Sequence, residues 1–231
     1  MSPGSPQETP AQQAVAAIAD SRLLPVVVID DAADAVPLAS ALKKGGLRCA
    51  EITLRTAAAA DALRTLAADG ELTVGAGTVL TVSQLEVVID AGAQYVVTPG
   101  FSPAIVRRCQ EFSVPVFPGV ATASDLHAAV DHGLDAVKFF PAEPLGGLGM
   151  LNALTAPFPG IRFIPTGGIT PASAAGYLRH PAVLAVGGSW MVAPHLIRTG
   201  DFAEITGLTA QAVALAAAPG SPGGNHDLEV P

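Results

Sequence analysis

The sequence AVKFFPAE, residues 136–143, places a single lysine inside an apolar run. The run predicts a buried strand, and Pro141 ends it because proline cannot donate a ladder hydrogen bond. Side chains alternate along a strand, so Ala136, Lys138 and Phe140 share one face. A strand lysine commonly extends its amine to water or pairs with a carboxylate. This segment alone therefore leaves a structural role for Lys138 open.

The same kind of run recurs along the chain, each time followed by a polar turn and an alanine-rich helical pattern that stops near glycine. Alternation of about eight strands with helices predicts an α/β fold, a single-domain (β/α)8 TIM barrel. A doubly wound open sheet is the alternative, but its usual GxGxxG signature after the first strand is missing. The predicted strands are Leu23–Ile29, Leu47–Leu54, Leu72–Ala76, Gln94–Val97, Val114–Phe117, Leu134–Phe140, Ile161–Ile164 and Val183–Val186.

Helix starts and tails set the domain limits. Thr9 followed by Pro10 and Gln12 is a capping box, which predicts a short N-terminal helix before the barrel. Residues 1–8 and 218–231 are rich in Pro, Gly and Ser and lack apolar periodicity, so we expect flexible tails around a barrel at 9–217. Further caps are predicted at Asp34, Thr81, Ser102, Thr122 and Thr170.

Composition excludes several classes of function. The 231 residues are 50% hydrophobic and carry 12 Lys plus Arg against 20 Asp plus Glu, a net charge of -8 that disfavours nucleic acid and anionic membranes. Apolar runs are too short to span a bilayer, so we expect a cytoplasmic protein. Cys49 and Cys109 form no CxxC pair, and the five histidines form no HExxH motif. We expect no metal and no cofactor.

A barrel gathers the loops after its strands at one end, where the chemistry occurs. Arg55, Thr78 and Pro99 follow the second, third and fourth predicted strands. Glu51 falls on the second-strand face that we expect to point into the barrel, where an unpaired carboxylate is costly. It could act in catalysis, or it could form an internal ion pair with Arg55 or Lys138.

Two glycine turns follow the last two predicted strands. Thr166-Gly167-Gly168 and Gly187-Gly188-Ser189 allow backbone N–H groups to approach an anion without obstruction by Cβ atoms. This is the usual phosphate position of such barrels. Tight strand exits also require glycine, so the pair of turns indicates a phosphate site more strongly than either turn does.

Five short motifs follow one another along the chain: EITLRT at 51–56, GAGTV at 75–79, KFFPAE at 138–143, PTGGI at 165–169 and GGSW at 187–190. Taken together, they resemble those of the 2-keto-3-deoxy-6-phosphogluconate aldolase family. The resemblance covers about residues 23–215 and implies a metal-independent class I aldolase with a (β/α)8 barrel, usually a homotrimer. Many family members also cleave 4-hydroxy-2-oxoglutarate.

The resemblance also implies roles for individual residues. Lys138 matches the Schiff-base lysine and Glu51 the general acid/base, and we expect Phe140 beside them in the substrate site. The other expected substrate contacts are Arg55 and Thr78 for a carboxylate, Pro99 beside the substrate, and Thr166, Gly167, Gly168, Gly188 and Ser189 around a phosphate. Some relatives have an arginine near the end of the first strand, where this chain has Val28.

The expected ligands are therefore a small-molecule 2-oxo acid and a phosphosugar. Cleavage of the phosphogluconate substrate would give pyruvate and glyceraldehyde 3-phosphate, and cleavage of 4-hydroxy-2-oxoglutarate would give pyruvate and glyoxylate. The galactonate epimer is an alternative substrate. From other classes, a barrel phosphosugar isomerase or epimerase, or a non-catalytic phosphosugar-binding protein, shares the phosphate turns without needing a nucleophilic lysine.

Overall fold

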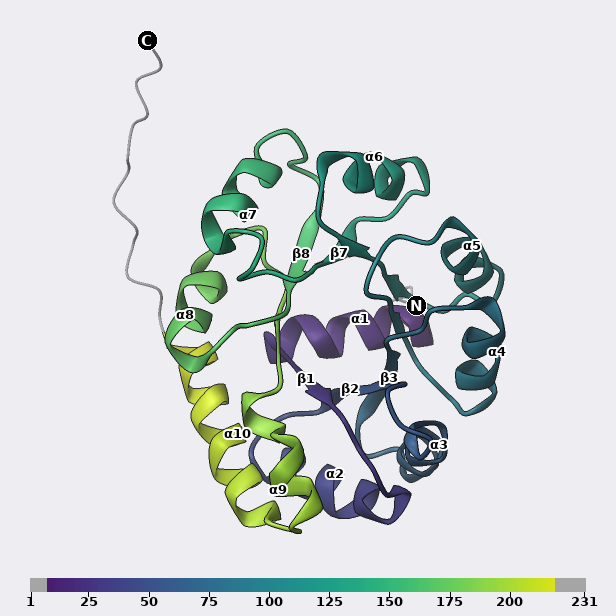
Figure 1. Cartoon of the computed structure of the whole chain (residues 1–231), viewed down its shortest axis with the longest axis vertical. Helices are drawn as coiled ribbons and strands as arrows, with labels where there is room; N and C mark the ends of the chain where they lie inside the picture. The colour runs from purple at the N-terminus through teal and green to yellow at the C-terminus, as the bar shows by residue number, and fades with distance from the viewer. Residues whose placement is uncertain (1–7, 219–231) are drawn as a thin grey trace, which may run out of the picture.

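The chain forms a closed parallel barrel, seen here in a computed structural model that describes residues 8–218 (Figure 1). The predicted tails at 1–8 and 218–231 lie outside the described residues, except for Glu8 and Ala218. The strands are β1 Leu23–Val27, β2 Cys49–Thr53, β3 Thr73–Gly77, β4 Val96–Val97, β5 Val116–Phe117, β6 Gly119–Val120, β7 Ala136–Phe139, β8 Arg162–Pro165 and β9 Val186–Gly188.

Hydrogen bonding closes these strands into a ring. One sheet has the order β5-β4-β3-β2-β1-β9 and the other β6-β7-β8, and every ladder is parallel. Single bridges from Phe163 to Val183 and from Thr166 to Gly187 join β8 to the segment that contains β9. Only Pro118 separates β5 from β6, so these two form one strand position. The (β/α)8 barrel prediction is confirmed, and closure excludes the open sheet.

The break at Pro118 differs from the single strand predicted at Val114–Phe117. Proline lacks the N–H that a continuous ladder needs, so the chain bonds to β4 before Pro118 and to β7 after it. The second strand is also shorter than predicted, because it ends at Thr53 and Arg55 lies in a turn. Arg55 therefore does not continue the alternation of Cys49 and Glu51.

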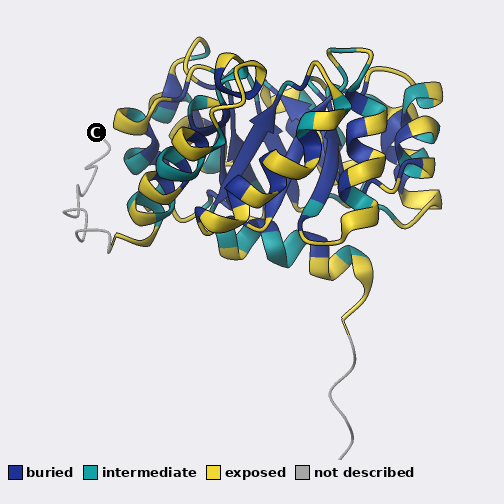
Figure 2. Cartoon of the chain, turned by 90° about the horizontal axis from the view of Figure 1, so that it is seen from below, coloured by how far each residue is buried: buried dark blue, intermediate teal, exposed yellow. Residues whose placement is uncertain are grey.

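Helices surround the ring with their polar faces outward, so the strands are buried (Figure 2). The helices are α1 Pro10–Ser21, α2 Ala35–Lys44, α3 Ala59–Asp69, α4 Val82–Asp90, α5 Pro103–Glu111, α6 Ala123–Asp131, α7 Gly147–Thr155, α8 Pro171–Arg179, α9 Pro194–Arg198 and α10 Phe202–Ala217. The described residues also form two short 3-10 helices, η1 Ala32–Asp34 and η2 Trp190–Val192.

Most predicted helix caps are present. The hydroxyls of Thr81, Ser102, Thr122 and Thr170 each accept a hydrogen bond from the third backbone N–H of their helix, and Thr9 forms its predicted capping box. The prediction for Asp34 is wrong. Its backbone is already helical and its side chain makes no capping bond, because η1 precedes α2 and Asp31 caps η1 instead.

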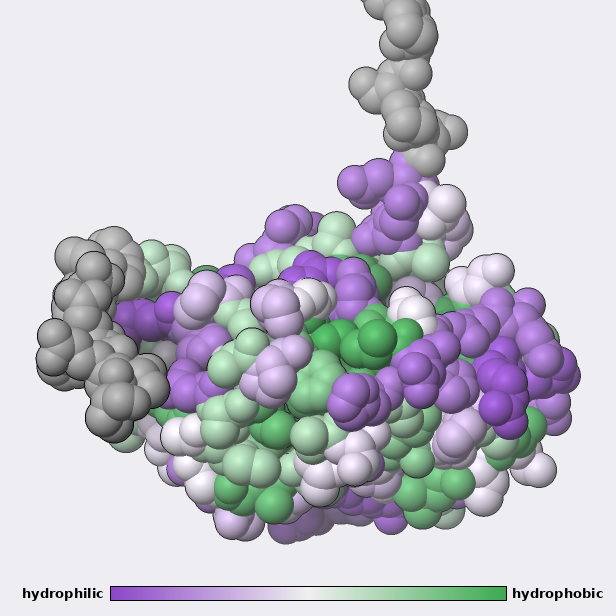
Figure 3. All heavy atoms as spheres, turned by 90° about the horizontal axis from the view of Figure 1, so that it is seen from above, coloured by the Kyte–Doolittle hydropathy of each residue, from purple (hydrophilic) through white to green (hydrophobic). Residues whose placement is uncertain are grey.

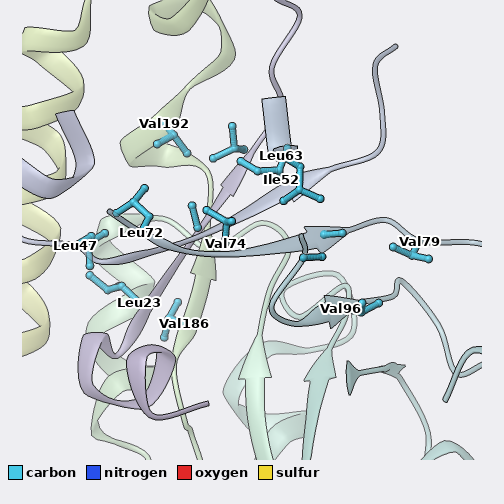
Figure 4. Packing of buried hydrophobic residues seen from close by; sticks show 14 of the residues in the cluster. Leu23, Leu47, Ile52, Leu63, Leu72, Val74, Val79, Val96, Val186 and Val192 are labelled. Atoms are coloured by element: carbon cyan, nitrogen blue, oxygen red, sulfur yellow. The ribbon is translucent and has the colours of Figure 1, made fainter. Parts of the chain in front are cut away.

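Two apolar cores lie on the two faces of the barrel wall. The outer core fills the layer between strands and helices and includes Leu23, Ile52, Leu63 and Val186 (Figure 4). The inner core is smaller and is formed by side chains that point into the barrel. Its fully or almost fully buried members are Ala14, Ile18, Leu24, Cys49, Tyr95, Val97, Phe117, Ala136, Ile164, Leu184 and Ala185.

The inner core closes one end of the barrel. Ala14 and Ile18 come from α1, which crosses the ring in Figure 1 and lies at the end opposite the strand arrowheads in Figure 2. Tyr95 fills the interior next to them, and its hydroxyl donates a 2.6 Å hydrogen bond to the carbonyl of Ala50. Access to the interior is therefore from the carboxyl ends of the strands.

The outer surface carries both hydrophobic and hydrophilic side chains. On the face that lies at the top of Figure 1, hydrophobic side chains form a patch between hydrophilic ones (Figure 3). An apolar hollow of about 480 Å³ lies between α6 and the segment after α7, lined by residues that include His127, Val130 and Phe158. Among the described residues, none of the helices has the length and apolar character that crossing a bilayer requires.

Candidate active site

Lys138 and Glu51 form a buried ion pair inside the barrel. The Lys138 Nζ atom lies 3.2 Å from Glu51 Oε1, and the two residues are only 5% and 1% exposed. They come from β7 and β2, on opposite sides of the ring. Strand alternation brings them together, because Ala136 and Cys49, two residues earlier on each strand, both belong to the inner core. Of the two partners considered for Glu51, the structure therefore has Lys138. Breaking such a buried pair leaves an uncompensated charge.

The second oxygen of Glu51 is unpaired. Oε2 is buried and has no hydrogen-bond partner among the described residues. A buried carboxylate oxygen without a partner is costly, and such a group indicates a catalytic role or a bound ligand. The carboxylate therefore has one oxygen engaged with the amine and one available to accept a proton.

Gly77 on β3 makes the space for this carboxylate. A Cβ atom at this position would lie 2.1 Å from Glu51 Oε1 and 2.5 Å from its Cγ. Gly75, two residues earlier on the same face, likewise gives room to the Tyr95 ring, which would be 2.2 Å from an added Cβ. The two glycines of the GAG sequence thus fit positions that face large side chains inside the barrel.

A pocket of about 300 Å³ opens above the ion pair at the carboxyl ends of the strands. Phe140 connects the two, since it lines the pocket and its ring centroid lies 5.3 Å from Lys138 Nζ. Arg55 is the one charged side chain among the described residues that line this pocket. The lining consists of Val26, Val28, Arg55, Phe140, Thr166, Gly167, Gly168, Ile169, Gly187, Gly188, Ser189 and Pro194.

Both predicted glycine turns line this pocket. Gly167 and Gly168 have φ of 101° and 78°, a region that favours glycine. Among the described residues, the N–H groups of Gly168 and Ser189 donate to no backbone or side-chain acceptor. Two turns with free N–H groups and one arginine form a site suited to an anion.

Close packing fixes the position of these turns. Gly187 lies against Thr166, whose hydroxyl oxygen would be 2.1 Å from an added Cβ. Gly188 lies against the ring of Trp190, which an added Cβ would meet at 1.8 Å. Thr166 itself is 6% exposed and bonds to the carbonyl of Ile164. The Trp190 ring therefore supports the second turn from behind.

Thr78 and Pro99 lie outside that lining. Each follows its strand at the same end of the barrel, β3 for Thr78 and β4 for Pro99. Thr78 has φ of 58°, which is rare for a β-branched residue and indicates a backbone held by its surroundings. The carbonyl of Pro99 lies close to Gly119, whose added Cβ would be 2.2 Å from that oxygen.

Several residues of the site were not predicted from the sequence. Val26, Ile169 and Pro194 line the pocket, and Gly77 makes room for Glu51. Alternation along β1 could have identified Val26, because Leu24 before it and Val28 after it also point inward. Pro194 begins α9 just after the 3-10 helix η2, where no strand alternation predicts which way a side chain points.

The cysteine thiols and the possible metal ligands do not add a further reactive centre to the described residues. Burial raises the pKa of Cys49 to about 11 and that of Cys109 to about 12, so both thiols are protonated near neutral pH. Within residues 8–218, His, Cys, Asp and Glu side chains form no group of three or more that could hold a metal ion. The polar groups near Lys138 fit an organic anion.

Comparison with known proteins shows which family this sequence matches. Residues 15–208 match the family model described as KDPG and KHG aldolase. A 2-dehydro-3-deoxy-phosphogluconate aldolase of Treponema pallidum (strain Nichols) is 48% identical over 195 residues, which cover 84% of this chain and 93% of the relative.

Solved structures agree with this match. KDPG aldolase from Legionella pneumophila, with pyruvate captured at low pH as a covalent carbinolamine intermediate, superposes with a TM-score of 0.84 and 40% identity over 87% of this chain and 98% of that one. The 2-keto-3-deoxy-6-phosphogluconate aldolase of Zymomonas mobilis ZM4 with 3-phosphoglycerate gives a TM-score of 0.82 and 41% identity over 89% and 97%.

Proposed function

This chain belongs to the KDPG and KHG aldolase family, and on this premise we propose that it is a Schiff-base aldolase that uses Lys138 and Glu51. The reaction is the reversible cleavage of 2-dehydro-3-deoxy-6-phosphogluconate to pyruvate and glyceraldehyde 3-phosphate. The same residues would cleave 4-hydroxy-2-oxoglutarate to pyruvate and glyoxylate. The observation that carries the proposal is the buried contact of 3.2 Å between Lys138 Nζ and Glu51 Oε1 below an anion-binding pocket.

The first step is attack of the Lys138 amine on the C2 carbonyl of a 2-oxo acid. Only the neutral amine is nucleophilic, and transfer of one proton across the contact to Glu51 Oε1 produces it. Addition gives a carbinolamine, the adduct held by the Legionella pneumophila relative with pyruvate. Glu51 then gives this proton to the hydroxyl of the adduct, which leaves as water, so an iminium ion forms and Glu51 is a carboxylate again. The positive charge of the iminium ion accepts the electrons released later.

Carbon–carbon cleavage follows from the iminium ion. Glu51 takes the proton of the C4 hydroxyl, the C3–C4 bond breaks, and its electron pair moves into the iminium to give an enamine of pyruvate. The aldehyde leaves with its new C=O bond. Glu51 returns the proton to C3, and water hydrolyses the resulting iminium to release pyruvate and the free Lys138 amine. The unpaired Oε2 atom of Glu51 supports its assignment as the acid/base.

The pocket supplies the contacts that orient the substrate. We assign Arg55 and Thr78 to the C1 carboxylate and place Pro99 and Phe140 beside the carbon chain. The free N–H groups of Gly168 and Ser189, in the turns that also contain Thr166, Gly167 and Gly188, would hold the phosphate. The relative with 3-phosphoglycerate supports a phosphorylated ligand. Val28 adds no charge to the wall, so phosphate binding rests mainly on backbone groups.

Reduction of the imine tests this proposal. Incubation with pyruvate and sodium borohydride should add the mass of a reduced pyruvyl group to the peptide that contains Lys138, and it should abolish turnover. Lys43 and Lys44 on α2 serve as internal controls, because both side chains lie at the exposed end of an outer helix. A label on either of them, with Lys138 unmodified, would refute the assignment.

Turnover assays distinguish the alternative substrates and the alternative classes of protein. The galactonate epimer remains an alternative substrate, and steady-state kinetics with both epimers and 4-hydroxy-2-oxoglutarate rank them. A phosphosugar isomerase or epimerase of the same fold would bind phosphate without being trapped by borohydride, and a non-catalytic binding protein would show no turnover. The buried lysine favours the aldolase.

We propose two further properties with the function. A homotrimer is supported by the family resemblance and by exposed apolar side chains such as Val87 and Val130, both 50% exposed. Sedimentation velocity at micromolar concentration tests it, since a stable monomer would contradict it. A cytoplasmic location is supported by the phosphorylated metabolites that the reaction uses, and fractionation of source cells tests it.

A further inference from the structure

A buried tyrosine holds an acidic side chain next to the phosphate turn. Tyr177 on α8 is 1% exposed, and its hydroxyl donates a 2.9 Å hydrogen bond to Glu143 Oε1. Glu143 follows β7, and the residue as a whole is exposed. Burial, and secondarily the bond to Glu143, raise the pKa of Tyr177, so the hydroxyl stays a donor at all working pH values.

Glu143 is attached to the first glycine turn on two sides. Its backbone N–H donates to the carbonyl of Gly167 at 3.1 Å. Its side-chain stem lies against Gly168, where an added Cβ would be 2.9 Å from the Cβ and 3.2 Å from the Cγ of Glu143. The carboxylate end lies by contrast near Gly147, at 3.6 Å from an added Cβ there. The charge is thus directed away from Gly168 and towards Tyr177.

This direction matters because the pocket has a weak positive charge. Arg55 is the one cation among its described lining residues, and the net charge of the chain is -8. Rotation of the freed Glu143 side chain would bring a carboxylate towards a bound phosphate. Repulsion between two anions in a partly dehydrated pocket would reduce affinity, by a factor on the order of ten.

We propose that Tyr177 is a positioning residue that holds the Glu143 carboxylate away from the phosphate-binding turn, and that this contact sets the preference for phosphorylated over non-phosphorylated substrates. The inference rests on the proposed function. Tyr177 touches no substrate in this scheme, since it acts through Glu143. The preference is measured as the ratio of KM for 2-dehydro-3-deoxy-6-phosphogluconate to KM for 4-hydroxy-2-oxoglutarate.

The central experiment compares Tyr177→Phe with the double variant Tyr177→Phe/Glu143→Gln. The single variant should raise KM for the phosphorylated substrate about tenfold and leave KM for 4-hydroxy-2-oxoglutarate and both kcat values within about twofold. The double variant should restore the wild-type ratio, because a free amide does not repel phosphate. A merely structural tyrosine would raise both KM values together, and Glu143→Gln would not rescue it.

Two companion variants keep the test decisive if Tyr177→Phe fails to fold. Glu143→Asp retains the charge but is too short to reach the hydroxyl, so it should reproduce the tenfold rise for the phosphorylated substrate. Glu143→Gln with Tyr177 intact can still accept the bond and should leave the ratio within about twofold of wild type. An unchanged ratio in Glu143→Asp, or a changed one in Glu143→Gln, overturns the proposal.

A binding measurement separates this inference from the proposed function. Inorganic phosphate should raise the thermal unfolding midpoint of the wild type and of the double variant, and it should do so less at equal concentration for Tyr177→Phe. Equal shifts in all three proteins would overturn the role of Tyr177. Absence of wild-type turnover on both substrates would instead refute the proposed function, while the phosphate comparison still decides the positioning role.

Discussion

The carboxylate of Glu51 occupies the space that a side chain on Gly77 would need, with Oε1 2.1 Å from an added Cβ. The neighbouring strand thus determines where the proposed acid/base group can lie. Gly77→Ala should therefore displace Glu51 from Lys138, and we expect kcat to fall by about 10²-fold or more. Gly207→Ala on α10 is the control, because an added Cβ meets no atom within 4 Å there and helix propensity improves. Wild-type kcat in Gly77→Ala would contradict this prediction.

Glu51→Gln separates imine formation from cleavage. The amide keeps the shape of the side chain but cannot take the C4 hydroxyl proton. We expect borohydride trapping of pyruvate to persist while cleavage falls by about 10²- to 10⁴-fold, as measured by coupled assay of pyruvate release. Near-normal cleavage, together with normal proton exchange at C3 of pyruvate, would reduce Glu51 to a structural partner of Lys138. A bound water or Thr53 would then be the next candidate for the base.

Arg55→Ala tests the assignment of the carboxylate contact. The arginine would bind the C1 carboxylate from the ground state onward, so KM should rise for every 2-oxo acid while the preference for phosphorylated substrates is kept. Arg64→Ala is the matched control, since Arg64 forms an exposed pair with Asp61 on α3, away from the pocket. A rise confined to the phosphorylated substrate would place Arg55 on the phosphate.

The stability of the fold should depend on pH through His180. Burial lowers the pKa of His180, whose Nδ1 accepts the Ala182 N–H at 3.1 Å and whose Nε2 lies 2.9 Å from Asn152 Oδ1. This bonding fits the neutral ring, because protonation at Nδ1 removes the acceptor. A pKa lowered on folding gives stability that is present above the unfolded value of about 6.5 and is lost as pH falls through the folded value.

The measurement is urea unfolding of wild type and His180→Asn between about pH 7.5 and pH 5. The asparagine oxygen can replace Nδ1 as acceptor and does not titrate. We expect the free energy of unfolding of the wild type to exceed that of the variant by less as pH falls, while the activities of the two proteins stay similar. An advantage that grows towards acid would show the opposite sign of the pKa change.

Much of the fold follows from local patterns that the sequence displays. Alternation along the second strand predicted that Glu51 points into the barrel, and threonine before a helical run predicted caps at Thr81 and Thr170. These signals are local, because they depend on period and on the first turn of a helix. They required no knowledge of how the ring closes.

The sequence-based predictions were wrong or missing where contacts between distant segments determine the structure. Arg55 was expected directly after a strand that ends at Leu54, but β2 ends at Thr53 and a turn carries the arginine to the pocket wall. Pro118 divides one strand position because its neighbours on the two sides differ. The contact between Tyr177 and Glu143 joins residues 34 apart in sequence, and no pattern in either segment indicates it.

The helix α1 gives the barrel a floor, with Ala14 and Ile18 packed into the inner core. A barrel that is open at one end only fixes the order in which two ligands enter and leave it. In the proposed reaction, pyruvate is bonded to the deep amine of Lys138, and the aldehyde with its phosphate lies nearer the open end of the barrel. Glyceraldehyde 3-phosphate would therefore leave first in cleavage and enter last in synthesis, because the depth of each product in the barrel fixes the order.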